Sequence, residues 1–322
     1  MGTWYRVKLI TERPLGVEHR GTLDTLIRLR LDTVDREMST YRADSLVSRF
    51  NRSRPGEATS LGAATADVLK LALRVSEETD GAFDVTVAPL VDAWGFGPDG
   101  PHRPLTAEEV APLLERVGWR LLALDGGELS KRTPGVEIDL SAIAKGYAVD
   151  LVLESVARYG QGAMVEVGGE IRVTGLNRER RPWRLAIEAP TPERRGIQRV
   201  VEATDVAIAT SGDYRNFYEE AGRRYSHTID PATGAPVTHR GASVSVLHEE
   251  CALADAYATA LLVMGPERGL AWARERNLPI LYLVYDAEGG VSEWATPPMA
   301  ELLGASLDAA GRVTAGASPS AR

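Results

Sequence analysis

The sequence lacks the features of several protein classes. It contains one cysteine, Cys251, so neither an internal disulfide nor a zinc site built on several thiolates is possible. No apolar run approaches the roughly 20 residues that span a bilayer, so no membrane span is predicted. The opening MGTWYRVKLI does not read as a signal peptide, and no cysteine is placed as a lipid anchor. As written, we expect the chain in the cytoplasm, with export expected only if its true start lies upstream.

Basic charge is also scarce. Lys and Arg number 37 against 45 Asp and Glu, which gives a net charge of −8. An acidic chain is a poor general nucleic-acid binder, because contacts with phosphates need a basic surface. Hydrophobic residues make up 44% and charged residues 25%, which is typical of a globular protein with a sizeable core. The sequence therefore predicts a folded chain without a nucleic-acid partner.

Helical and strand patterns are interspersed without a regular βαβ rhythm, which predicts an α+β fold of mixed, largely antiparallel sheets with flanking helices. A strand is predicted at Val136–Leu140, and the strands on either side of Gly168-Gly169 form either a hairpin or a bulged pair. Thr106 and Glu109 match a capping box. Helices are predicted at 22–38, 62–79, 106–117, 252–264 and 266–276, and strands at 183–188, 199–203, 206–209, 242–247 and 279–285.

No linker divides the chain, so residues 1–305 are predicted to form one domain. Two closely packed subdomains are the alternative, with a break in the loops near 97–104 or 174–182. The last residues are small and polar, which predicts a disordered tail over 306–322.

The segment GVEIDLSAIAKGYAVD places an acid and a lysine around the start of a helix. Asp139 ends the predicted strand, and Ala142 and Lys145 follow three and six residues later. A helix N-terminus with a nearby lysine suits a phosphate. The alternative is that Asp139 caps the helix and Lys145 is solvated. The chain contains neither the glycine-rich phosphate loop nor the dinucleotide-binding fingerprint, so a Rossmann fold has no support.

The segment CALADAYATALLVMG places Asp255 and Thr259 on one face of a helix, four residues apart. Carboxylate, hydroxyl and carbonyl oxygens are the ligands that Mg²⁺ prefers. The alternative is an alanine-rich core helix that contains one aspartate, a residue that is unfavourable to bury. A buried carboxylate needs a partner or a metal in either case. Cys251 is interpreted as a buried small residue.

His227 lies in YSHTIDPATGAPV, close to Asp230. A lone histidine of a strand is more often structural than catalytic. Taken alone, GAFDVTVAPLVDAWGFGP is also more typical of a strand with a Trp-rich loop than of a functional segment.

Seven segments stand in order along the chain, namely MGTWY, MSTYRADSLVSRFN, GAFDVTVAPLVDAWGFGP, IDLSAIAKGYAVD, VEVGGEIRV, ATSGDYRNFYEEAGRRYSHTIDPATGAPV and ASVSVL with CALADAYATALLVMG. Together they resemble the FAD:protein FMN transferase (ApbE-type flavin transferase) family. The resemblance implies an ApbE-like, T-fold-like α+β fold that holds FAD in a central cleft. It implies an Mg²⁺-dependent enzyme that transfers FMN from FAD to a Ser or Thr hydroxyl of an acceptor protein through a phosphoester bond and releases AMP. The acceptor would be a membrane redox-complex subunit or a flavin-carrying domain.

The resemblance also assigns roles to particular residues. His227 is the expected general base. The expected FAD contacts are Met1, Tyr41, Ala82, Phe83, Asp84, Asp139, Lys145 and Ile229. The expected metal ligands and their neighbour are Ala142 through its carbonyl, Asp255, Ala258 and Thr259.

Two other functions fit parts of the same pattern. An Mg²⁺-dependent FAD pyrophosphatase giving FMN and AMP would use the same residues, with water in place of the acceptor hydroxyl. A non-catalytic flavin-binding protein would not need a metal at the pyrophosphate.

Overall fold

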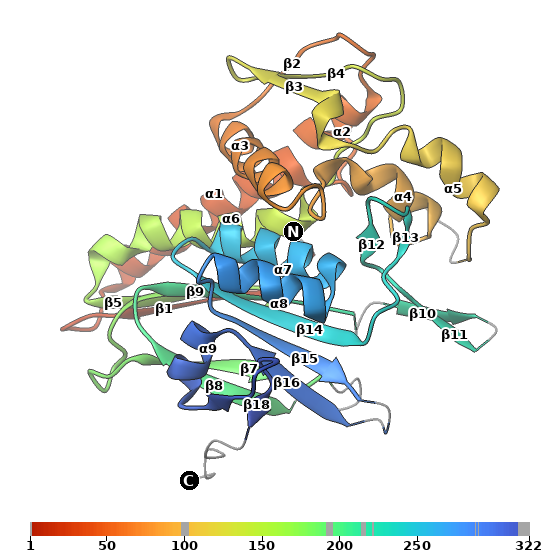
Figure 1. Ribbon diagram of the computed structural model, residues 1–322. Helices are drawn as coiled ribbons and strands as arrows, with labels where there is room; N and C mark the ends of the chain where they lie inside the picture. Colours follow the sequence, from red (N-terminus) through yellow and green to blue (C-terminus); the bar gives the residue numbers. More distant parts are fainter. Residues whose placement is uncertain are drawn as a thin grey trace. The chain divides into compact units, whose positions relative to one another are not determined.

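The computed structural model describes residues 2–97, 103–190, 196–213, 217–220, 222–286, 288 and 290–314 (Figure 1). The described residues divide into two units. Gly2 and the described parts of Arg28–Ala144 and Asn216–Thr238 form the first unit. The described parts of Thr3–Ile27, Lys145–Arg215 and His239–Arg322 form the second unit. Neither 97–104 nor 174–182, the two loops predicted as breaks, contains a boundary between these units.

The second unit is built on an antiparallel sheet, which confirms the predicted α+β fold. In the described residues this sheet has seven strands in the order β1-β5-β6-β9-β14-β15-β16, and every pairing is antiparallel. The strands are β1 (Tyr5–Ile10), β5 (Gly162–Val167), β6 (Glu170–Gly175), β9 (Val206–Gly212), β14 (Gly241–His248), β15 (Ile280–Tyr285) and β16 (Val291–Ala295).

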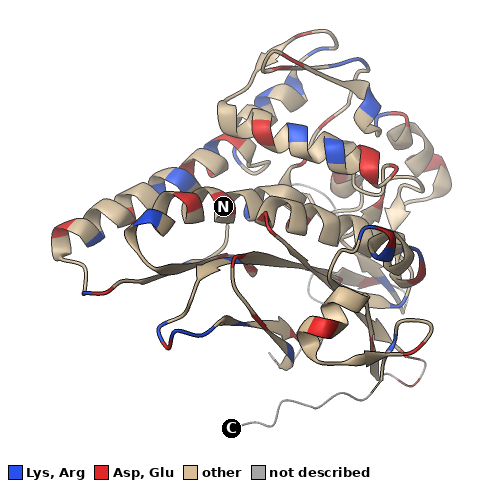
Figure 2. Cartoon of the chain, turned by 60° about the vertical axis from the view of Figure 1, so that its left-hand side comes forward, with Lys and Arg blue, Asp and Glu red and all other residues tan. Residues whose placement is uncertain are grey.

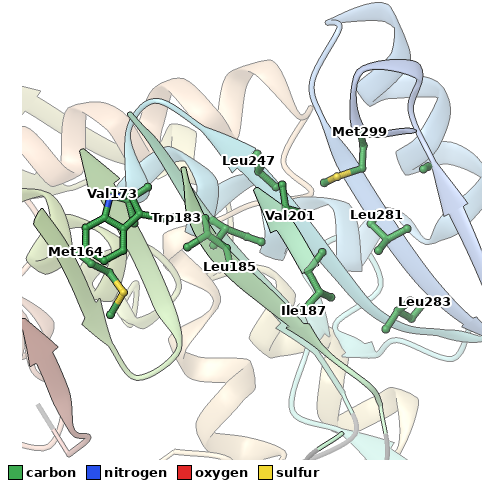
Figure 3. Packing of buried hydrophobic residues seen from close by; sticks show 12 residues of the cluster. Met164, Val173, Trp183, Leu185, Ile187, Val201, Leu247, Leu281, Leu283 and Met299 are labelled. Atoms are coloured by element: carbon green, nitrogen blue, oxygen red, sulfur yellow. The ribbon is translucent and has the colours of Figure 1, made fainter. Parts of the chain in front are cut away.

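Both faces of this sheet are covered. Helices α7 (Cys251–Met264) and α8 (Pro266–Glu275) lie on one face, and the β7–β8 hairpin (Trp183–Glu188 and Ile197–Ala203) and α9 (Pro297–Leu303) lie on the other (Figure 1). Side chains alternate along a strand, so Leu247 of β14 packs against Leu185 and Val201 of the hairpin (Figure 3). Burying a side chain of this size contributes about 1.5–3 kcal/mol. The unit also contains η3 (Ala157–Tyr159), β17 (Ser306–Leu307) and β18 (Val313–Thr314).

Short helices and small sheets make up the first unit. The predicted capping box is confirmed, because Thr106 and Glu109 bond each other's backbone at the start of α5, which ends at Leu114 rather than at 117. The helices are α1 (Val17–Met38), which begins in the second unit, α2 (Leu46–Arg52), α3 (Ala63–Glu78), η1 (Val85–Val87), α4 (Ala88–Ala93), α5 (Ala107–Leu114) and η2 (Trp119–Leu121). The strands are β2 (Thr59–Ser60), β3 (Leu122–Asp125), β4 (Glu128–Lys131), β10 (Phe217–Glu220), β11 (Arg223–Ser226), β12 (Ile229–Asp230) and β13 (Ala235–Pro236).

Acidic and basic residues are interspersed along the helices (Figure 2). Arg36 pairs with Asp32 on α1, and Lys70 pairs with Asp67 on α3. These side chains are exposed, so each pair contributes at most about 1 kcal/mol. Within the described ranges, no helix has both the length and the apolar character that crossing a membrane requires.

Residues 136–140 do not form the predicted strand. Val136, Ile138 and Leu140 are buried, as the alternating apolar pattern suggests. The backbone of Ile138, however, pairs with the side chain of Asn51. Asn51 accepts a hydrogen bond from the Ile138 N–H at 2.9 Å and donates one to the Ile138 carbonyl at 3.0 Å. One amide side chain thus substitutes for a neighbouring strand, and a pattern of apolar residues carries no signal for that substitution.

Two further expectations are decided by the structure. Gly168 and Gly169 both have positive φ, 62° and 110°, and form the turn of the β5–β6 hairpin, so the hairpin alternative is correct. The predicted disordered tail is wrong for 306–314, because β17 and β18 pair there. The rest of that tail, 315–322, lies outside the described residues.

Helix α6 (Ser141–Val156) approaches the start of α7 closely at Gly146. A Cβ atom at Gly146 would overlap the Cys251 carbonyl oxygen and lie 2.8 Å from the Cα atom of Ala252. One turn further along α6, Asp150 accepts hydrogen bonds from the N–H groups of Cys251 and Ala252, both at 2.9 Å. A carboxylate from α6 therefore caps the N-terminus of α7, which receives no cap from its own preceding side chain.

Gly146→Ala is expected to destabilise the second unit by about 1–3 kcal/mol, because the added methyl group forces the two helices apart. Gly21 of α1 is the matched control: it is also helical, but a Cβ there would meet nothing within 4 Å. Gly21→Ala should stabilise the protein by up to about 1 kcal/mol through helix propensity. Chemical denaturation of both variants measures the difference, and a Gly146→Ala variant as stable as Gly21→Ala would contradict the close approach.

Candidate active site

Three charged side chains of the second unit converge beside this helix crossing. The Nζ atom of Lys145, on α6, lies 3.2 Å from each carboxylate oxygen of Asp255, on α7. It also lies 3.2 Å from Oε1 of Glu170, the first residue of β6. The N–H of Gly146 donates to Oδ2 of Asp255 at 3.0 Å. One ammonium group is therefore shared between two carboxylates, whose side chains are only 3% and 6% exposed.

Burial and charge act against each other in this cluster. Burial disfavours the charged form of Lys145, but Asp255 and Glu170 outweigh it and raise the pKa of the ammonium above its ordinary value. Burial also raises the pKa of Glu170, to about 7, with a further contribution from the Asp255 charge and an opposing one from Lys145. Near neutral pH, Glu170 is thus the member of the cluster that changes its protonation.

The cluster decides two alternatives left open by the sequence. Asp255 is a buried aspartate in an alanine-rich helix, and Lys145 and Gly146 are its partners. The Lys145 side chain is 33% exposed, so it is partly solvated, but its ammonium is paired with both carboxylates. The small residues of α7 permit this approach; Ala258, like Ala254 and Ala256, is fully buried. Cys251 is also fully buried, as expected, and burial raises the pKa of its thiol.

The oxygen atoms near Asp255 fit a divalent cation. Thr259 lies one helical turn after Asp255, and its hydroxyl is 3.1 Å from the hydroxyl of Ser211 on β9. Oε2 of Glu170 is buried and has no hydrogen-bond partner among the described residues. Carboxylate and hydroxyl oxygens suit Mg²⁺, and an unsatisfied buried carboxylate oxygen is a group that a cation would stabilise.

In the first unit, Asp84 and Asp139 organise the backbone around them. Asp84 accepts hydrogen bonds from the N–H and hydroxyl groups of Thr86 and from the N–H of Trp119, at 2.6–2.8 Å. The Asp139 side chain accepts from the N–H of Ser141, so the capping alternative is correct, and its own N–H donates to the Val85 carbonyl at 2.7 Å. Both acids thus fix the chain around residues 84–87.

His227 follows β11 and lies beside a group of aromatic rings in the first unit. The Phe96 ring meets the imidazole edge-on, with 6.3 Å between ring centroids. Phe96 also packs against Tyr218, and Tyr218 stacks on Tyr225 with centroids 5.1 Å apart. Such contacts contribute about 0.5–1.5 kcal/mol each and restrict how the rings turn.

The predicted site residues fall in both units. Lys145 and Asp255 are brought into direct contact, which the sequence alone did not predict. Glu170, the third member of the cluster, is not among the predicted site residues, although it belongs to VEVGGEIRV; its only sequence signal is a lone acid directly after a Gly-Gly turn. Met1 lies outside the described residues. Lys145, Asp255, Ala258 and Thr259 belong to the second unit, and Tyr41, Ala82, Phe83, Asp84, Asp139, Ala142, His227 and Ile229 to the first.

The raised pKa of Glu170 predicts a pH-dependent stability. The folded chain holds this proton up to about pH 7, whereas an unfolded Glu loses it near 4.5. The unfolding free energy therefore falls as the pH rises through this window. Glu170→Gln has no such proton, so its stability relative to the parent should increase by on the order of 2 kcal/mol between pH 5 and pH 8. Urea denaturation in chelator measures this, and a difference that stays constant or decreases with pH would contradict it.

Residues 1–282 match the sequence model of the ApbE family. A FAD:protein FMN transferase of Vibrio cholerae is 46% identical over 298 residues, covering 92% of this chain and 88% of that protein. The one of Haemophilus influenzae is 40% identical over 90% of this chain and 86% of its own length.

Solved structures give the same result. The flavin transferase ApbE from Vibrio cholerae superposes with a TM-score of 0.85 at 44% identity, covering 94% of this chain and 96% of that one. The apo form of the flavinyl transferase ApbE from Pseudomonas stutzeri also has a TM-score of 0.85, at 37% identity and 94% coverage of both chains. The resemblance predicted from the sequence is confirmed: the chain belongs to the ApbE family.

Proposed function

We propose that this protein transfers FMN from FAD to a Ser or Thr hydroxyl of an acceptor protein, with release of AMP. The observation that carries the proposal is the ion pair between Lys145 and the buried Asp255 carboxylate, with the hydroxyls of Thr259 and Ser211 on the same unit. This pair lies in a chain of the ApbE family. Two relatives named FAD:protein FMN transferase match this chain over 88% and 86% of their own length. A membrane redox-complex subunit or a flavin-carrying domain is the acceptor we expect.

Asp255 and Thr259 are the residues of the second unit that would hold Mg²⁺. The carbonyl of Ala142 stays a predicted further ligand, and Ala258 a predicted neighbour of the site. When bound, Mg²⁺ would act as a Lewis acid on the phosphate oxygens of FAD. Both oxygens of Asp255 face a cation already in this structure, namely the ammonium of Lys145. The carboxylate is therefore held in place before any metal binds.

Lys145 would bind the pyrophosphate of FAD. Its raised pKa keeps the ammonium charged over the whole physiological pH range. Charge that develops on the leaving phosphate of AMP is stabilised by a positive group fixed nearby.

His227 would act as the general base. The hydroxyl oxygen of the acceptor attacks the phosphorus on the FMN side, its proton passes to the imidazole, and the P–O bond to AMP breaks. An unperturbed imidazole has a pKa of about 6.5, which suits a base that works near neutral pH. The edge-on contact with Phe96 would help to orient the ring.

The predicted FAD contacts of the first unit stay proposals. Tyr41 is 73% exposed, so its ring is open to a ligand. Asp84 and Asp139 fix the backbone near Phe83 and Val85, and we expect them to shape the binding surface in this way. Met1, Ala82 and Ile229 complete the proposed set.

Incubation of the full chain with FAD, MgCl₂ and a candidate acceptor tests the function. We expect mass spectrometry to find FMN bonded to the acceptor, AMP in solution, and no reaction in chelator. Asp255→Asn and Thr259→Val should lose most of the turnover, whereas the matched Thr259→Ser keeps the hydroxyl and should retain it. Free FMN without a modified acceptor would instead indicate a pyrophosphatase, and unchanged FAD a non-catalytic flavin protein.

His227→Ala should lose on the order of 10²–10⁴ in transfer rate while binding FAD about as tightly as the parent. The parental rate should fall on the acid side of the pH profile, as the imidazole becomes protonated. His19→Ala, at an exposed position of α1, is the control and should transfer FMN normally. If His227→Ala is folded and saturated with FAD yet transfers FMN at the parental rate, His227 is not the base.

A further inference from the structure

We propose that Glu170 is a positioning residue that takes over the Lys145 ammonium when a divalent cation occupies Asp255. This inference rests on the proposed function, which places Mg²⁺ at Asp255. It gives a role to a buried acid that neither the predicted metal ligands nor the predicted FAD contacts include.

The Lys145 ammonium occupies the side of Asp255 that a metal ion would use. Its Nζ atom is equally distant, at 3.2 Å, from Oδ1 and Oδ2, so it lies symmetrically in front of the carboxylate. Oδ2 also accepts from the Gly146 N–H, which holds the carboxylate in this orientation. A divalent cation that binds there must displace the ammonium, because two cations at this separation repel strongly in a buried site.

Glu170 has the free capacity to receive the displaced group. Oε1 already lies 3.2 Å from Nζ, and Oε2 is buried without a hydrogen-bond partner among the described residues. An ammonium group has three donors and a carboxylate accepts several hydrogen bonds. A small movement of Lys145 away from Asp255 would thus satisfy Oε2 and leave Asp255 to the metal.

The position of Glu170 is fixed by its backbone. It follows the Gly168-Gly169 turn and begins β6, which is paired on one side with β5 and on the other with β9. Its side chain has little freedom to follow a moving partner, so the flexible side chain of Lys145 is the one that moves. The effect of Glu170 on metal binding therefore depends on direct contact with the Lys145 ammonium. A carboxylate that acted only through its charge at a distance would not need this contact.

Calorimetric titration of the metal-free full chain with MgCl₂ at pH 8 tests this inference without using activity. Glu170→Gln should raise the Kd for Mg²⁺ about tenfold or more, because the displaced ammonium then has no carboxylate to bind. Glu170→Asp keeps the negative charge, but its side chain is shorter by one methylene and reaches the Lys145 ammonium less well. If Glu170 acts through contact, the Kd of this variant lies between those of the parent and Glu170→Gln. Glu293→Gln removes another buried, ion-paired carboxylate of the same unit and should leave the Kd unchanged.

Lys145→Met provides a second, independent variant. It removes the competing cation, so it should bind Mg²⁺ at least as tightly as the parent. Melting temperatures of all variants confirm that the folded protein is titrated. A parental Kd in either Glu170 variant, or weaker Mg²⁺ binding by Lys145→Met, would overturn the inference.

Asp255→Asn in the same titration separates this inference from the proposed function. If Asp255→Asn binds Mg²⁺ as the parent does, the metal assignment itself fails. If it loses Mg²⁺ binding while both Glu170 variants retain parental affinity, only the role of Glu170 fails.

Discussion

The close approach of α6 to the first turn of α7 is the constraint on which the site in the second unit depends. It exists because Gly146 has no side chain at the point of contact and because Asp150 caps the N-terminus of α7 from α6. The same approach lets the Gly146 N–H donate to Asp255 and brings the Lys145 ammonium in front of the carboxylate. A side chain at this position would separate the helices and, with them, the charged groups of the cluster.

Burial makes this charge pairing obligatory. Asp255 and Glu170 are both almost inaccessible to water, and an isolated carboxylate there would cost several kcal/mol. Lys145 pairs with both carboxylates, while burial raises the pKa of Glu170 and leaves its Oε2 without a hydrogen-bond partner among the described residues. An unsatisfied buried carboxylate oxygen is a group that a cation would stabilise.

The sequence predicts the elements better than the contacts between them. Apolar patterns place α7, α8 and the β5–β6 hairpin closely, because the apolar residues of these elements are buried in the fold. Residues 136–140 show the same pattern, but the N–H and carbonyl of Ile138 bond to Asn51, 87 positions away, and no local pattern carries that pairing. Likewise, Lys145 and Asp255 are 110 positions apart, so their contact follows from the fold and not from either motif. The family resemblance predicts the roles of Lys145 and Asp255. Glu170 is identified by its burial and its unsatisfied oxygen, which only the structure shows.

A crystal structure of the full chain grown with FAD and Mn²⁺, with the metal located by anomalous scattering, tests the central claim most directly. The account predicts a metal peak at coordination distance from a carboxylate oxygen of Asp255 and next to the Thr259 hydroxyl. It also predicts that Lys145 has left Asp255 and donates to both oxygens of Glu170. A metal bound away from Asp255, or a Lys145 ammonium still seated on both Asp255 oxygens with FAD and metal in place, would contradict it.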